Sequence, residues 1–165
     1  MADTKFKGSD VRTNANLPAV GAPAPAFTLV GSDLSEKTLA DFKGKKVVLT
    51  VNPSYDTGVC QATARQFNKS VGARGDVVVL AVSADLPFAQ NRFCLAEGLD
   101  HVVPLSSFRS SFAKDYGLEL VDGPLRGLTG RAGRGGGEDG NVKYSEIVPE
   151  ITNEPNYDAV ASALG

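Results

Sequence analysis

Two apolar runs rich in β-branched residues constrain the fold of this chain more than any other feature. They are Lys46–Asn52 and Val77–Ser83, and each has the length of a strand. Neither alternates apolar with polar residues, so both are expected to be buried on two faces, as in a parallel sheet. Between them, Thr57–Val71 has apolar residues at roughly helical spacing and no proline. Strand, helix and strand in this order predict a βαβ unit.

Further elements alternate along the chain in the same way. A helix is expected over 86–97, because Pro87 stands in its first turn and Gly98 follows its end. The first 26 residues predict an N-terminal extension with little regular structure beyond a short hairpin around Gly8. The remaining expectations are strands at 27–30 and 142–148 and helices at 110–116 and 157–164. The predicted fold class is therefore α/β, a three-layer sandwich with a central mixed sheet.

Length and charge exclude several classes of protein. The chain has 165 residues and a net charge of −2, which gives no basic field for holding a phosphate backbone. Nucleic-acid binding is therefore not expected. The longest apolar runs are far shorter than the ~20 residues that span a bilayer, and the N-terminus lacks a signal-peptide pattern. We expect one cytoplasmic domain over residues 1–165, with no membrane segment.

The chain contains only two cysteines, Cys60 and Cys94, and one histidine. A structural zinc site needs four Cys or His ligands in paired spacings, so no metal site is predicted. In a reducing compartment a cysteine pair is either inert or redox-active, because lasting structural disulfides are rare there. Composition leaves both possibilities open.

The segment Asn52–Cys60 joins the first long strand to the following helix. Active sites of open α/β sheets gather at this carboxyl edge of the strands. If Thr57 caps the helix, Cys60 is its third residue, where free N–H groups and the helix dipole favour a thiolate. Pro53 would stiffen the approach and shield the site from water. The alternative is an inert cysteine, since free cysteine is among the most buried residue types.

Two motifs and several shorter segments match one known family in sequence order. Pro53–Cys60 fits the pattern Pro-x-x-x-Thr-x-x-Cys, and Ser83–Cys94 is the second motif. Shorter matches follow at 96–99, 105–109, 123–128 with 131–132, and 150–155. On these residues the chain resembles the thiol peroxidases of the atypical 2-Cys peroxiredoxin group, over nearly its whole length. The resemblance implies a thioredoxin-like fold and a peroxidase that uses two cysteines of one chain.

The resemblance also implies a role for each site residue. Cys60 looks like the peroxidatic cysteine, whose thiolate attacks H2O2 or an organic hydroperoxide and becomes a sulfenic acid. Thr57 would orient the peroxide, and Arg131 would stabilise the thiolate and the charge on the leaving oxygen. Cys94 looks like the resolving cysteine, which forms an intramolecular disulfide with Cys60 that thioredoxin reduces. The family further implies a homodimer and no cofactor, and Tyr55 and Pro53 would line the substrate pocket.

One segment departs from the family. Residues 132–141 contain five glycines where thiol peroxidases have an apolar strand. By itself this segment predicts a flexible loop, because glycine loses entropy in a strand and packs nothing. We favour a true sequence that differs over Gly133–Gly137, which an intact mass would reveal. The alternative is a sheet that tolerates a nearly bare strand and takes Arg134 into its core.

A second functional class stays open. The chain could be a non-catalytic thioredoxin-like module in which a Cys60–Cys94 disulfide is a regulatory signal read by a partner. Three other residues are interpreted conservatively, with His101 at the surface, Asp56 in a turn or cap, and Arg92 as a solvated charge. Phe88 and Phe93 are expected to pack, and the alternative is that they line a substrate pocket or a dimer contact together with Tyr55, Leu105 and Phe108.

Overall fold

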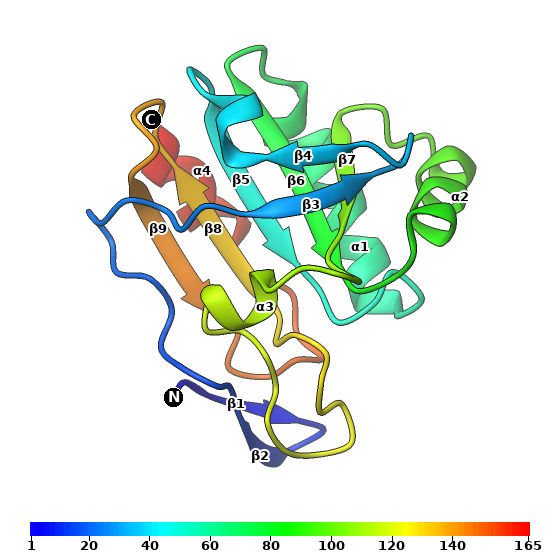
Figure 1. Cartoon of the computed structure of the whole chain (residues 1–165), viewed down its shortest axis with the longest axis vertical. Coiled ribbons are helices and arrows are strands. Elements are labelled where there is room, and N and C mark those ends of the chain that lie inside the picture. The colour runs from blue at the N-terminus through cyan, green and yellow to red at the C-terminus, as the bar shows by residue number, and fades with distance from the viewer.

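The computed structural model describes residues 1–165 and contains one large mixed sheet (Figure 1). Its strand order is β4-β3-β7-β6-β5-β8-β9. Strands β5, β6 and β7 are parallel, while β3, β4, β8 and β9 pair antiparallel with their neighbours. The bounds are β3 Thr28–Gly31, β4 Glu36–Thr38, β5 Lys46–Val51, β6 Val77–Ser83, β7 Val102–Ser106, β8 Ala132–Gly136 and β9 Val142–Ile147.

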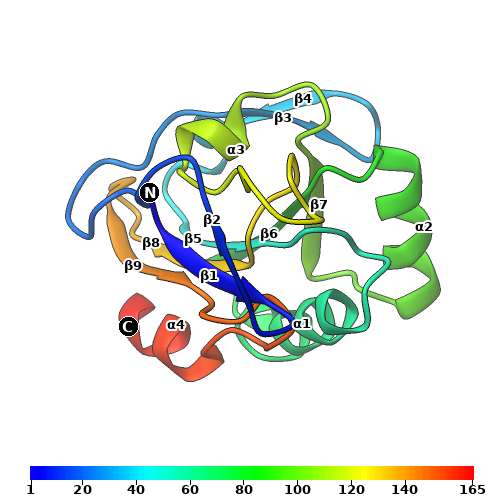
Figure 2. The same ribbon diagram turned by 90° about the horizontal axis from the view of Figure 1, so that it is seen from below.

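Helices cover the sheet on both sides (Figure 2). Helices α1 and α4 lie on one side of the sheet, and α3 lies on the other side together with β3 and β4. Helix α2 lies beside β7. None of the helices is long and apolar enough to cross a membrane. The bounds are α1 Gly58–Lys69, α2 Pro87–Glu97, α3 Phe112–Asp115 and α4 Tyr157–Leu164, with short 3-10 turns at Leu39–Phe42 and Val71–Ala73.

The two long apolar strands are buried on both faces, as predicted. Along β5, Val48 faces the core under α1 and α4, whereas Val47 and Leu49 face the core under α3. Strand β6 alternates in the same way, with Val79 on the first face and Leu80 on the second. The sheet therefore separates two hydrophobic cores, and the three-layer α/β sandwich is confirmed.

The expected N-terminal hairpin is also present. Strands β1 (Asp3–Phe6) and β2 (Ser9–Arg12) pair antiparallel around a two-residue turn. Both turn residues have positive φ, 51° at Lys7 and 82° at Gly8, as a type I′ hairpin turn requires. The Glu150 carboxylate accepts hydrogen bonds from both of their backbone N–H groups. This contact fastens the hairpin to the segment that follows β9.

The glycine-rich segment is a strand, so the prediction of a flexible loop is wrong. Strand β8 lies between β5 and β9 and pairs with both, from Val51↔Ala132 to Val47↔Gly136 on the β5 side. Its stability comes from ladder hydrogen bonds along two edges rather than from its own side chains. Strand β7 was not predicted either, because Pro104 interrupts its apolar pattern.

Candidate active site

Thr57 and Cys60 form the first turn of α1, at the carboxyl end of β5. Thr57 is the N-cap, and its Oγ1 accepts a hydrogen bond of 3.3 Å from the backbone N–H of Cys60. The Thr57 hydroxyl itself donates to the carbonyl of Ser54 at 3.2 Å. The predicted cap is confirmed, and Cys60 is the third residue of the helix. Thr57 is exposed on this turn, whereas Cys60 is fully buried.

Arg131 enters the site from the residue before β8. Its side chain is buried, and the Nη1 group donates to the Cys60 Sγ at 3.1 Å. Two further acceptors hold the guanidinium, the Ile151 carbonyl for Nε at 2.7 Å and the Asn52 Oδ1 for Nη1 at 2.8 Å. A hydrogen bond from a cation is stronger to a thiolate than to a neutral thiol, so Arg131 is placed to stabilise negative charge that develops on this sulfur.

Sequence reasoning missed the two groups that aim this arginine. Asn52 directly follows β5 and is fully buried, and its backbone carbonyl accepts a hydrogen bond from the Thr129 hydroxyl at 3.1 Å. A buried polar residue at the carboxyl end of a strand was a usable signal for Asn52. Ile151 acts through its backbone carbonyl, which no side-chain pattern reveals.

Cys94 lies in the last turns of α2 and is also buried. Burial raises the pKa of its thiol to about 11, and no cation faces it as Arg131 faces Cys60. Both cysteines are free thiols in this structure. Cys94 is therefore a protonated thiol at neutral pH in this arrangement.

Tyr55 lies in the core near both cysteines. Its ring stacks on Phe93 with centroids 5.2 Å apart, and its hydroxyl donates to the Ala81 carbonyl at 2.9 Å. Burial raises the pKa of the Tyr55 phenol, and the nearby Asp85 carboxylate raises it further. Pro53 is buried too, so in this reduced state neither Tyr55 nor Pro53 presents an open pocket wall.

The remaining candidates lie on the surface. His101, Asp56 and Arg92 are exposed, as interpreted from the sequence. Phe93 packs as expected, but Phe88 is 68% exposed, so the prediction that it packs within the chain is wrong. Helix α2 turns its Cys94 face toward the core, which leaves Phe88 in solvent.

Comparison with known proteins places the chain in a family. The family model described as Redoxin matches residues 19–161. The thiol peroxidase of Mycobacterium tuberculosis is 52% identical over 165 residues, covering 100% of this chain and 99% of that protein. The thiol peroxidase of Corynebacterium glutamicum is 45% identical over 164 residues, covering 99% of each chain.

Similarity to solved structures agrees with this assignment. A peroxiredoxin-like protein from Aquifex aeolicus superposes with a TM-score of 0.92 at 36% identity. The match covers 99% of this chain and 96% of that one. The fold is thus the thioredoxin-like fold of peroxiredoxins, and the chain belongs to the Redoxin family, among its thiol-dependent peroxidases.

Proposed function

We propose that Cys60 is the peroxidatic cysteine of this thiol-dependent peroxidase, within a single domain of residues 1–165. The observation that carries the proposal is the 3.1 Å contact between Arg131 Nη1 and the Cys60 sulfur. A thiolate, a cation and an oriented hydroxyl held close together are what attack on an O–O bond requires.

In the first step, the Cys60 thiolate attacks the terminal oxygen of the hydroperoxide. An S–O bond forms as the O–O bond breaks, and the departing hydroxide or alkoxide takes a proton to leave as water or an alcohol. The product on Cys60 is a sulfenic acid. Arg131 stabilises negative charge on the sulfur and then on the leaving oxygen, while the Thr57 hydroxyl orients the peroxide.

In the second step, the Cys94 thiol condenses with the Cys60 sulfenic acid, giving an intramolecular disulfide and water. A dithiol reductant of the thioredoxin type then returns both cysteines to thiols. Cys94 lies on a different helix, and burial raises its pKa to about 11. A thiol attacks through its thiolate, so the segments around the cysteines must open locally before the disulfide forms.

The competing function is a redox sensor without turnover. A sensor needs a reactive thiol and a second cysteine, but it does not need a hydroxyl that orients a peroxide, which is the role proposed for Thr57 beside Cys60. The set of Thr57, Cys60 and Arg131 therefore favours the peroxidase.

A coupled assay separates the two functions. NADPH, thioredoxin reductase and thioredoxin are supplied with H2O2 or cumene hydroperoxide, and NADPH oxidation is followed. The peroxidase predicts peroxide-dependent turnover that Cys60→Ser abolishes, whereas Cys94→Ser consumes one equivalent of peroxide and is not recycled by thioredoxin. No peroxide-dependent NADPH oxidation by the parent protein would favour the sensor.

We further propose that the protein acts in the cytoplasm as a homodimer that associates through its active-site side. The support is a group of exposed apolar side chains on α2 and nearby loops: Leu86, Phe88, Leu95 and Phe108. Analytical ultracentrifugation of the parent and of Phe88→Glu tests the dimer. A monomeric parent would contradict it.

A further inference from the structure

Asp85 ties the active-site loop to the rest of the molecule. Its carboxylate accepts three hydrogen bonds, from Ser54 Oγ at 2.8 Å, from the Tyr55 backbone N–H at 2.7 Å and from Ser83 Oγ at 2.7 Å. Two of these donors belong to the loop between β5 and α1, which leads into Thr57 and Cys60. Asp85 itself lies between the end of β6 and the start of α2.

The side of Asp85 away from the loop is held rigidly. Gln90, in the first turns of α2, donates from Nε2 to Ser83 Oγ at 2.9 Å and to the Leu105 carbonyl at 3.0 Å. The Ser106 hydroxyl donates to the Asp85 carbonyl. These contacts join β6, β7 and α2 around Asp85, whose carboxylate accepts the hydrogen bonds from the β5–α1 loop. If the hydrogen bonds from Ser54 and Tyr55 to the Asp85 carboxylate break, the loop between β5 and α1 is the part that is free to move.

Formation of the Cys60–Cys94 disulfide is expected to move this loop. Cys60 is fully buried against Arg131, and Cys94 lies on α2 as a separate free thiol. Tyr55, whose N–H bonds Asp85, also stacks its ring on Phe93 beside Cys94. Loss of the hydrogen bonds to Asp85 would therefore loosen two parts of the site together. These are the backbone that precedes Cys60 and the Tyr55 ring that stacks on Phe93, next to Cys94.

We propose that Asp85 is a positioning residue that sets how the Cys60 sulfenic acid divides between disulfide formation and over-oxidation. This inference rests on the proposed function. The first fate joins the sulfenic acid to the Cys94 thiol and releases water, and it needs the loop to open. The second fate takes a second hydroperoxide, whose oxygen converts the sulfenic acid to a sulfinic acid while an alcohol or water leaves. It proceeds with Cys60 still beside Arg131.

Asp85→Asn weakens this attachment without a large change of shape. The neutral amide has one acceptor oxygen and removes the charge that strengthens all three hydrogen bonds. In that variant the loop opens more readily, so a larger share of the Cys60 sulfenic acid forms the disulfide and a smaller share is over-oxidised. Asp56→Asn is the matched control, since Asp56 is exposed in the same loop and its carboxylate accepts no hydrogen bond from the site.

In the decisive experiment, the reduced enzyme turns over with thioredoxin as reductant while the peroxide concentration is increased. The fraction of enzyme that carries a sulfinic acid is measured by intact mass. We expect the peroxide concentration that over-oxidises half of the enzyme to rise roughly tenfold in Asp85→Asn, the scale set by losing one charged hydrogen bond. Capture of the first peroxide equivalent should be slower in the same variant. Asp56→Asn should match the parent. An unchanged or lowered half-point in Asp85→Asn, or an equal shift in both variants, would overturn the inference.

Two further measurements keep this test interpretable. Ser54→Ala removes one donor and leaves Asp85 intact, so it should shift the half-point in the same direction by less, even if Asp85→Asn folds poorly. Hydrogen exchange of the Tyr55 amide in the reduced protein tests the attachment without peroxide. Faster exchange in Asp85→Asn than in Asp56→Asn supports it, and equal exchange contradicts it. A parent enzyme inert to peroxide would overturn the proposed function, while the amide exchange would still judge the attachment.

Discussion

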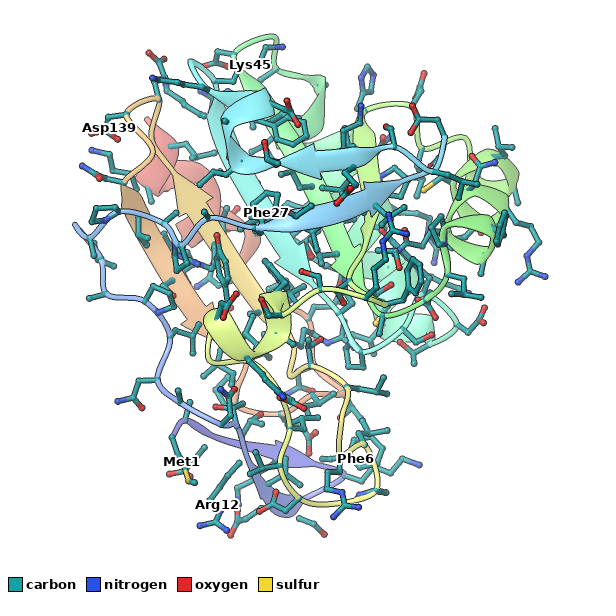
Figure 3. All side chains as sticks on the ribbon, in the orientation of Figure 1. Met1, Phe6, Arg12, Phe27, Lys45 and Asp139 are labelled. Carbon is teal, nitrogen blue, oxygen red and sulfur yellow. The ribbon has the colours of Figure 1, made fainter.

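Two buried arginines, Arg131 and Arg134, lie three residues apart and have different surroundings. Figure 3 shows all side chains of the chain on the ribbon. Arg131 donates to the Ile151 carbonyl, the Asn52 amide oxygen and the Cys60 sulfur. Arg134, within β8, leaves its Nε and Nη1 groups without hydrogen-bond partners. Its charge lies over the Tyr116 ring, 4.7 Å from the centroid. The comparison shows that the buried Arg131 cation is held by hydrogen bonds where it faces the Cys60 sulfur, whereas the buried Arg134 cation lacks hydrogen bonds at two of its nitrogens.

The incomplete compensation has consequences for both groups. Burial lowers the pKa of Arg134 from its ordinary value, and burial raises the pKa of Tyr116 to about 12. A cavity of about 30 Å³ beside Arg134, walled by Val47, Leu49 and Val142, is large enough for about one water molecule. An aromatic face and so small a cavity replace only part of the hydration that the guanidinium loses.

The largest expected effect is on the reaction with peroxide. Arg131→Met removes the cation beside Cys60, and we expect the second-order rate constant for H2O2 to fall by about 100-fold or more. The variant should also lose stability, because the Asn52 and Ile151 oxygens lose their donor. Competition with a peroxidase of known rate constant measures the first effect. Arg134→Met is the matched control and should retain the parent rate; equal losses in both would erase the distinction between the two arginines.

The two sulfurs extend the contrast, since Cys60 faces a cation and Cys94 does not. Burial raises the pKa of Cys94 from 9.0 to about 11, so the folded state favours its protonated form below that pH. In Cys60→Ser, alkylation of Cys94 by iodoacetamide at pH 8 should be about 100-fold slower than in the urea-unfolded chain. The rate should climb until about pH 11, whereas the unfolded chain levels off near pH 9. A plateau near pH 9 in the folded protein would contradict this assignment.

The incomplete hydrogen bonding of Arg134 can be tested by measuring the free energy of unfolding. Its replacement with methionine removes an incompletely paired buried charge and keeps an apolar side chain over Tyr116. We expect the free energy of unfolding to rise by about 1–4 kcal/mol, measured by urea titration at unchanged m-value. A loss of stability instead would show that the ring contact compensates this guanidinium as well as the oxygens compensate Arg131.

The smallest effect concerns the bare face of β8. A Cβ at Gly133 would meet Val160 at 3.5 Å and Pro155 at 3.6 Å, which are ordinary contacts. Gly133→Ala should therefore stabilise the protein by about 0.5–1 kcal/mol, by restricting the unfolded chain and packing against α4. Gly117→Ala is the control and should destabilise, because its φ is +69° and a Cβ would lie 2.3 Å from the Asn16 carbonyl oxygen. A destabilised Gly133→Ala would show that β8 needs glycine for its own geometry.

Local chemistry explains which features could be predicted from the sequence. The Thr57 cap, the position of Cys60 and the two-faced burial of β5 and β6 follow from neighbouring residues, and the structure has them as expected. Strand β8 could not be predicted in this way, since glycines carry no periodic pattern and its pairing with β5 is set by distant residues. Asp85 was missed for the same reason, because two of its three donors lie about 30 positions earlier in the chain.

Chemical trapping tests the central claim most directly, that the sulfur held by Arg131 is the one peroxide oxidises. Cys94→Ser is given one equivalent of H2O2 with dimedone, which labels sulfenic acids, and is digested with trypsin. Cys60 falls in the peptide 47–65. The account predicts rapid labelling of this peptide, and little labelling at the same time in the double variant that also carries Arg131→Met. An unlabelled peptide 47–65, or equal labelling with and without Arg131, would contradict it.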